Sequence, residues 1–210
     1  MLANGRVRLL PNRVRCARAD RARDAKTTLF VGALSKWHGY KGLEVLINAL
    51  AIASKLRKDM ALLVVGDGIL KPAYQKQASE LNLSDKVIIA GDASDQDLPS
   101  YYAASDLLVL PSKDRSEGFG LTILEANACG KPAIGSNVGG IPDVIHHGRN
   151  GLLVPPNDPK ALSNALVLLV EDDSLRTEMG RNGRRFAEEH DWSKVADATE
   201  KIYDEALQQH

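Results

Sequence analysis

Two glutamates, Glu117 and Glu125, lie eight residues apart, on either side of a Gly-Phe-Gly turn and the start of an apolar segment. If the chain from residue 121 onward is helical, one face of the helix carries Glu125 with three apolar side chains, Leu121, Leu124 and Ala128. We therefore expect Glu125 to point toward the core or a pocket. An unpaired carboxylate is unfavourable there, so we expect a ligand hydroxyl or a side chain distant in the sequence to bind it.

Each glutamate also has a simpler interpretation. Glu117 lies just before an expected helix, where a negative charge interacts favourably with the helix dipole. Glu125 could be paired with a backbone group or belong to a structural salt bridge. The two carboxylates together, with glycines between them and an apolar strand before them, favour a binding or catalytic site over these alternatives.

Loops rich in glycine follow several short apolar runs of the chain. Glycine lets backbone N–H groups approach an anion closely, and the N-terminus of a helix adds a favourable dipole. Lys36 and Lys41 would add positive charges, although a lysine at a helix start is commonly just solvated, and a lone Gly-x-Gly turn is common too. Four such loops at one edge of a sheet together predict an anionic, phosphorylated ligand. They cover residues 32–42, 66–68, 111–120 and 136–143.

Short apolar runs alternate with helix-like segments between residues 28 and 154. Continuous apolar strands separated by helices indicate parallel strands that are buried on both faces. Right-handed crossovers then give a doubly wound, Rossmann-like α/β sheet of about six strands, with ligands at the carboxyl ends of the strands. The expected strands are 28–31, 61–65, 87–90, 107–110, 132–135 and 152–154, and the expected helices are 42–57, 71–81, 95–104, 119–129 and 141–147.

After the two prolines at 155–156 the pattern becomes wholly helical. Asn157 or Asp158 can cap a helix that runs to about residue 170, and two further helices are expected over 174–189 and from about 192 to 207. The last helix has an apolar stripe, which must pack against the sheet or against a second domain. We divide the chain into an N-terminal arm (1–26), a sheet domain (27–190) and a C-terminal helix (191–210).

The composition limits the classes of partner. The chain has 210 residues, 44% of them hydrophobic, and 27 Lys plus Arg balance 27 Asp plus Glu. A formal net charge of zero argues against nucleic acid as the main partner. The N-terminal arm is a local exception with seven arginines. We interpret it as a solvated arm or interdomain linker, and contact with a polyanion or a membrane surface is the alternative.

Cysteine, histidine and hydropathy patterns point to a reducing compartment and no metal. Two cysteines cannot form a disulfide framework, and the five histidines lack the spacing of metal ligands. The chain has no signal-peptide pattern and no apolar run long enough to span a membrane. We expect a cytoplasmic location, with peripheral binding at the inner membrane face as the alternative.

With these residues in view, the chain resembles the C-terminal, nucleotide-sugar-binding domain of GT-B fold retaining glycosyltransferases. The resemblance is to family 4, also called glycosyl transferases group 1, and covers roughly residues 28–160. Its most specific motif is the glutamate pair. The matching stretches are FVGALSKWHGYKGLEVLINAL, LLVVGDG, VIIAG, YYAASDLLVLPSKDRSEGFGLTILEANACGKP, GSNVGGIPDVI and NGLLVPPND. VRLLPNRV also resembles the linker strand of the family, with Arg13 in place of the usual glycine.

The resemblance implies roles for both charged and glycine residues. Glu125 would accept hydrogen bonds from the ribose hydroxyls. Glu117 and Lys41 would be catalytic, Glu117 beside the donor sugar and Lys41 against the departing diphosphate. Gly91 would border the base. The remaining donor-binding residues would be Gly32, Lys36, Gly66, Gly68, Gly118, Phe119, Gly120 and Leu121, most of them through their backbones.

One position departs from the family pattern in a way that affects the diphosphate site. The family commonly has an arginine directly after the first-strand glycine, where this chain has Ala33. The loop that follows is longer here. We therefore expect Lys36 and Lys41 to form the clamp on the diphosphate together.

The resemblance implies transfer of a sugar from a UDP- or GDP-sugar to a sugar, lipid-linked or glycan acceptor, with retention and without an obligatory metal. We expect a hexosyltransferase, for instance a mannosyltransferase. Its N-terminal acceptor domain is expected to be absent here, so the fragment should be inactive and Trp192, Ile202 or Tyr203 should be exposed. The alternatives are another GT-B enzyme, such as a nucleotide-sugar epimerase or a glucan synthase, or a non-catalytic binding or assembly module.

Overall fold

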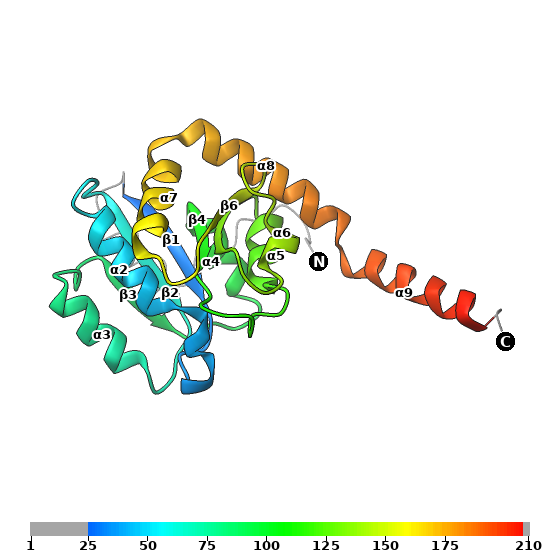
Figure 1. The fold of residues 1–210 in the computed structure, drawn as a ribbon, viewed down its shortest axis with the longest axis horizontal. Helices are drawn as coiled ribbons and strands as arrows, with labels where there is room; N and C mark the ends of the chain where they lie inside the picture. The colour runs from blue at the N-terminus through cyan, green and yellow to red at the C-terminus, as the bar shows by residue number, and fades with distance from the viewer. Residues whose placement is uncertain (1–24, 208–210) are drawn as a thin grey trace.

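The structure, a computed structural model, describes residues 25–207 apart from the side chains of Trp192 and Ala198. Its centre is a six-stranded parallel sheet with the strand order β3-β2-β1-β4-β5-β6 (Figure 1). The expected doubly wound sheet of six strands is therefore confirmed. The strands are β1 (Lys26–Val31), β2 (Met60–Val65), β3 (Val87–Gly91), β4 (Leu107–Leu110), β5 (Ala133–Ser136) and β6 (Gly151–Val154).

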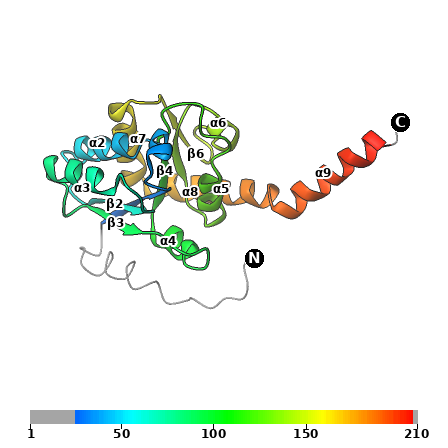
Figure 2. The same ribbon diagram turned by 90° about the horizontal axis from the view of Figure 1, so that it is seen from below.

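Helices cover both faces of this sheet. The helices are η1 (Lys36–Lys41, a 3₁₀ helix), α2 (Leu43–Ala53), α3 (Lys71–Glu80), α4 (Leu98–Ala104), α5 (Leu121–Ala128), α6 (Ile141–Val144), α7 (Pro159–Glu171), α8 (Asp173–Glu189) and α9 (Trp192–Leu207). One apolar cluster joins the sheet to α2, α3 and α7, and a second joins it to α4, α5 and α6 (Figures 1 and 2). Because β2 and β4 are buried along their whole length, their apolar runs are continuous rather than alternating.

Several boundaries differ from the expected ones for local reasons. The expected helix 42–57 ends at Ala53, and a 3₁₀ helix that was not anticipated precedes it. Gly42 separates the two because its φ of 72° is left-handed, which interrupts a continuous helix. β1 begins two residues earlier than expected, at Lys26, whose ammonium forms an ion pair with Asp173.

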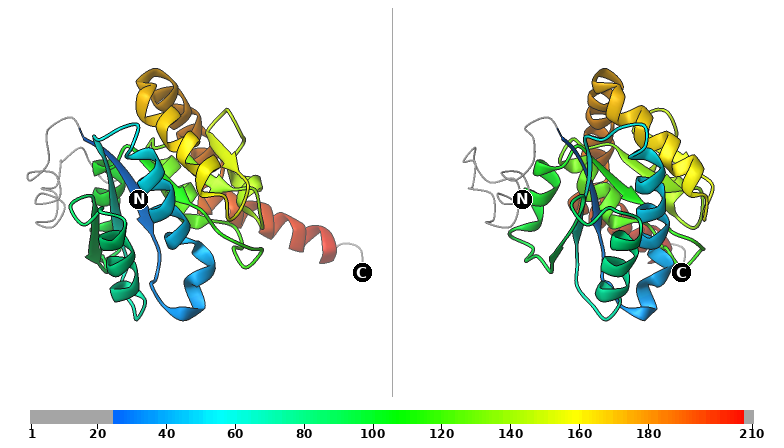
Figure 3. Two further views of the ribbon diagram at one scale, coloured as in Figure 1. Left: turned by 60° about the vertical axis from the view of Figure 1, so that its left-hand side comes forward. Right: turned by 90° about the vertical axis from the view of Figure 1, so that its left-hand side faces the viewer.

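The C-terminal part forms the three expected helices. Asp158 caps α7, since its Oδ1 accepts hydrogen bonds from the N–H groups of Lys160 (3.0 Å) and Ala161 (2.9 Å). α8 packs on α5, whereas α9 extends away from the sheet domain (Figure 3). The expected exposure is confirmed for Ile202 (64%) and Tyr203 (67%).

Two sequence-based expectations fall on parts of the chain that the structure does not describe. They are the arginine-rich arm, of which residues 1–24 lie outside the described residues, and the side chain of Trp192. Within residues 25–207, no helix combines the length and the apolar composition needed to cross a membrane.

Candidate functional site

The strand order creates one point at the edge of the sheet at which a ligand is expected to bind. β1 pairs with β2 on one side and with β4 on the other, so the connections leave β1 and β4 in opposite directions. In open α/β sheets, ligands bind beyond the carboxyl ends of the strands at such a switch point. The segments that follow β1 and β4 carry Lys41 and Glu117. Tertiary structure therefore brings the two candidate catalytic residues to the same place.

Lys41 and Glu117 form an ion pair that is largely removed from water. The Lys41 Nζ atom donates to Glu117 Oε2 at 3.0 Å, and 14% and 8% of the two side chains are exposed. Ser112, which is completely buried, donates from its Oγ atom to the same oxygen at 3.2 Å. The carboxylate is thus fixed by one charged and one neutral donor. Ser112 has no assigned role in the sequence analysis, although it stands in the loop singled out there.

The route of the Lys41 side chain explains the glycine at position 32. A Cβ atom on Gly32 would lie 2.9 Å from Lys41 Cδ, so the aliphatic part of the lysine passes directly over this glycine. On the other side of Lys41, a Cβ atom on Gly42 would lie 2.1 Å from the carbonyl oxygen of Pro111. The loop after β1 is therefore packed tightly against the loop after β4, which holds Lys41 toward Glu117.

Gly66, Gly68 and Gly91 lie at the same edge of the sheet. Cβ atoms on Gly66 and Gly68 would lie 2.0 and 2.4 Å from backbone carbonyl oxygens of the loop after β1. The Gly66 N–H donates to the Gly91 carbonyl at 2.9 Å. Close packing between loops accounts for Gly66 and Gly68 without a ligand, and the roles of all three glycines toward a donor stay predictions.

The loop after β5 supports the turn that carries Glu117. A Cβ atom on Gly140 would lie 1.7 Å from the carbonyl oxygen of Gly118, and the Gly140 N–H donates to the Glu117 carbonyl at 3.3 Å. Position 118 itself is open, because a Cβ atom there would meet nothing within 4 Å. Both loops are glycine-rich in the sequence, but only the structure shows that the loop after β5 holds the loop after β4 in place.

Glu125 does not point into the core, so the first of the two expected positions, core or pocket, is wrong. The buried residues of α5 are Ile123, Ala126 and Asn127, whereas Glu125 is exposed. The reason is that α5 packs against both β4 and α8, and this contact buries the face opposite to the apolar stripe used in the sequence argument. Leu121, on that stripe, is 50% exposed.

The partner of Glu125 is a side chain distant in the sequence. Tyr102 on α4, which is only 2% exposed, donates from its hydroxyl to Glu125 Oε2 at 2.5 Å. Burial, and to a lesser degree the negative charge of Glu125, raise the pKa of Tyr102 far above its usual value, so the phenol stays protonated. Tyr102 is a site residue that the sequence analysis missed. The one signal for it in the sequence was that the Glu125 carboxylate needs a hydrogen-bond partner.

The remaining candidates surround this edge in different ways. Gly120 is the N-cap of α5, with a left-handed φ of 76°, and its carbonyl accepts a hydrogen bond from the Ile123 N–H at 2.8 Å. Phe119 is 41% exposed.

Lys36 is exposed and begins η1, whereas Lys41 ends it, so their Cα atoms are separated by about 10 Å along a 3₁₀ helix. The structure does not bring Lys36 to Glu117.

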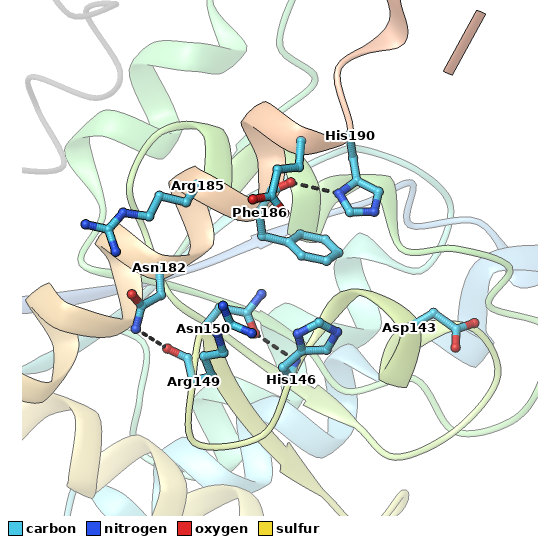
Figure 4. A pocket seen from close by; sticks show the side chains of 9 residues that line it. Asp143, His146, Arg149, Asn150, Asn182, Arg185, Phe186 and His190 are labelled. Carbon is cyan, nitrogen blue, oxygen red and sulfur yellow. Dashed lines mark hydrogen bonds between the residues drawn. The ribbon is translucent and has the colours of Figure 1, made fainter. Parts of the chain in front are cut away.

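A separate cavity lies between α6, α8 and the turn that follows α6 (Figure 4). Its volume is about 380 Å³, and none of the candidate site residues lines it. Phe186 and His190, which both line it, stack with ring centroids 4.0 Å apart. The candidate residues therefore lie at the sheet edge and not around this cavity.

Comparison with known proteins places the site in a family context. The sequence profile described as Glycosyl transferases group 1 matches residues 17–186. A D-inositol 3-phosphate glycosyltransferase from Streptomyces avermitilis is 34% identical over 203 residues, which are 92% of this chain and 43% of that protein. The chain thus spans about half the length of the curated relatives that it matches.

Solved structures share the fold over most of the chain. Anabaena HepE in complex with UDP and glucose has a TM-score of 0.78 and 25% identity, covering 95% of this chain and 53% of that one. The C-terminal domain of a glycosyl transferase group 1 family protein from Francisella tularensis has a TM-score of 0.68 and 27% identity. That match covers 77% of this chain and 84% of the Francisella chain.

Proposed function

The chain belongs to the glycosyl transferases group 1 family, and on this premise we propose that it is the donor-binding domain of a retaining GT-B glycosyltransferase. In the proposed reaction, the bond between the sugar C1 atom and the diphosphate oxygen breaks. A new bond to an acceptor hydroxyl forms on the same face of the sugar, and the acceptor proton is released. The protein must stabilise negative charge on the diphosphate and positive charge on the sugar.

The buried Lys41–Glu117 pair at the switch point is the observation that carries this proposal. An ammonium group held at the sheet edge can stabilise the charge that develops on a departing diphosphate. A carboxylate held beside it can stabilise positive charge on the sugar ring. Together with the first turn of α5, Lys41 supplies the charge stabilisation that a metal supplies in other transferases, so the proposed reaction needs no obligatory metal.

We also propose Lys36 as a second cation for the diphosphate. Its ammonium is exposed, and η1 is attached to the same sheet edge as Lys41. This proposal predicts that Lys36→Ala and Lys41→Ala weaken nucleoside diphosphate binding to a similar extent. An unchanged affinity in Lys36→Ala would contradict it.

For the donor, we propose a UDP-hexose. The UDP bound to Anabaena HepE supports uridine, and a GDP-sugar such as GDP-mannose is the alternative. The name of the Streptomyces relative supports a hydroxylated acceptor, such as a sugar, a glycan or a lipid-linked form of either. Because the chain spans about half of its curated relatives, we propose that the acceptor site belongs to a separate N-terminal domain on which α9 packs. The chain alone should then bind nucleotide and transfer little sugar.

Calorimetric titration of the chain with UDP, GDP and ADP, with and without magnesium, tests the proposal. We expect binding of one diphosphate in the micromolar to millimolar range, independent of magnesium and strongly weakened in Glu125→Ala. Glu125→Ala leaves the buried Tyr102 hydroxyl without its acceptor, so denaturant unfolding of this variant must first show that it is folded. A folded chain that binds none of the three nucleotides would contradict the donor-binding proposal. If deletion of residues 191–210 then abolished self-association, an assembly module would be favoured.

A further inference from the structure

Glu125 and Tyr102 form an unusual pair, because one partner is exposed and the other is buried. Glu125 is exposed on α5, while Tyr102 is 2% exposed inside the apolar cluster that joins α4, α5 and α6 to the sheet. The hydroxyl and the carboxylate are 2.5 Å apart although the residues are 23 positions apart. A glutamate on an open helix face normally samples several rotamers in water. This one is tied to a group that cannot move without opening the core.

The hydrogen bond leaves most of the carboxylate available to a ligand. A phenol has one proton to donate, and here it is directed to Oε2. A carboxylate has about four lone-pair sites, so Oε1 and one side of Oε2 can still accept hydrogen bonds. Two adjacent hydroxyl groups on one ring are suited to this arrangement, because they can donate to one carboxylate together.

The helix that carries Tyr102 is itself anchored. Tyr101 and Tyr102 are both buried, and Ser105 donates from its Oγ atom to the Tyr101 carbonyl at 2.8 Å. The position of the Tyr102 hydroxyl is therefore set by the core and not by the solvent-exposed surface. Glu125 receives its orientation from α4, even though it belongs to α5.

We propose that Tyr102 is a positioning residue for the ribose contact that the family resemblance implies for Glu125. Its hydroxyl holds the Glu125 carboxylate in the orientation that accepts from two vicinal hydroxyls. This inference rests on the proposed function, since it assigns a ligand group to the same site. The alternative is that Glu125 merely satisfies the buried hydroxyl of Tyr102, as buried tyrosines usually require a hydrogen-bond partner. The two readings differ in whether loss of the hydroxyl changes recognition of the ribose.

Titration with UDP and with 2′,3′-dideoxyuridine diphosphate separates the readings. If the first titrations identify another base, the matching pair of that base is used. We expect the wild-type chain to prefer the ribonucleotide by about 10-fold, as for loss of a hydrogen bond to a charged group. Tyr102→Phe should lower the affinity for the ribonucleotide several-fold and leave the affinity for the dideoxy analogue unchanged. In the Glu125→Ala background, Tyr102→Phe should have no further effect.

Two further variants control for effects on folding. Tyr101→Phe removes a phenolic oxygen from the neighbouring position of the same helix and should keep the wild-type preference. Glu125→Asp, at an exposed position, withdraws the carboxylate from Tyr102 by about 1.5 Å and should reduce the preference even if Tyr102→Phe does not fold.

The outcomes distinguish this inference from the proposed function. If the wild-type chain binds UDP but Tyr102→Phe keeps the full ribose preference, the positioning role is wrong and the donor-binding proposal stands. An equal loss of affinity for both nucleotides would mean that Tyr102 acts only on the fold. If the folded wild-type chain binds no nucleotide, both proposals are overturned.

Discussion

Lys41 and Glu117 form a buried ion pair in which each charge depends on the other. Both side chains are largely removed from water, and their charges compensate each other at 3.0 Å. Replacing such a pair by neutral groups is often tolerated, whereas removing one partner leaves an uncompensated buried charge. The Lys41–Glu117 pair therefore has to be tested by changing the residues singly and together.

Lys41→Met should lower the free energy of unfolding by about 3 kcal/mol, because Glu117 keeps only Ser112 as a donor. The double variant Lys41→Met/Glu117→Gln should recover most of this loss, since no buried charge remains. Denaturant unfolding at neutral pH measures both. Lys36→Met is the matched control, and its exposed position predicts a change within about 0.5 kcal/mol. Equal small effects at positions 36 and 41 would show that the pair is solvated in solution.

Among the loops and helices, the contact between the β4 and β5 loops determines the shape of the site. Gly140 lies against Gly118 so closely that no side chain fits between them, although its own φ of −87° is allowed for any residue. The restriction at Gly140 is thus steric rather than conformational. It fixes the turn that presents Glu117 and the amide groups at the start of α5.

Gly140→Ala should displace this turn, lower the free energy of unfolding and weaken nucleotide binding. Its added Cβ atom would lie 1.7 Å from a carbonyl oxygen. The backbone must move apart to remove this clash. Gly118→Ala is the matched control on the other side of the same contact, where the Cβ position is free within 4 Å. We expect it to fold like the wild type, so any loss of nucleotide affinity would report direct contact with the ligand. Calorimetry and denaturant unfolding of both variants test this. Similar stability losses in the two variants would contradict the steric argument.

At the level of the whole chain, α9 is separate from the sheet domain. All of its described side chains are exposed, including Val195 (41%) and Leu207 (78%). Lys194 donates from its Nζ atom to the Glu188 carbonyl at 2.7 Å, a contact that positions only the first turn. The apolar face of α9 is consistent with the proposed packing on an N-terminal domain.

Deleting residues 191–210 should change the free energy of unfolding of the sheet domain by less than about 1 kcal/mol, because α9 buries little apolar area against it. The deletion should also reduce concentration-dependent self-association, since it removes exposed apolar side chains. Denaturant unfolding and analytical ultracentrifugation measure these two effects. A large loss of stability would mean that α9 folds back onto the sheet domain in solution.

The order of elements could be predicted because it depends on local patterns. Continuous apolar runs such as 107–110 indicate buried parallel strands, and Asp158 before a proline marks a helix start that the structure confirms. The helix ends were less accurate. The left-handed Gly42, for example, lies where a Cβ atom would meet the carbonyl of Pro111, and this close approach is invisible in the local sequence.

By itself, the sequence determined the sheet, the edge at which the glycine-rich loops gather and the two glutamates that mark the candidate site. Only the tertiary structure decided which side chains meet there. It placed Lys41 against Glu117 across 76 positions, turned Glu125 to the open face of α5 and supplied Tyr102 from another helix. Periodicity defines the faces of a helix from its own backbone geometry. Which face becomes buried is decided by the neighbours packed against it, here β4 and α8 on α5.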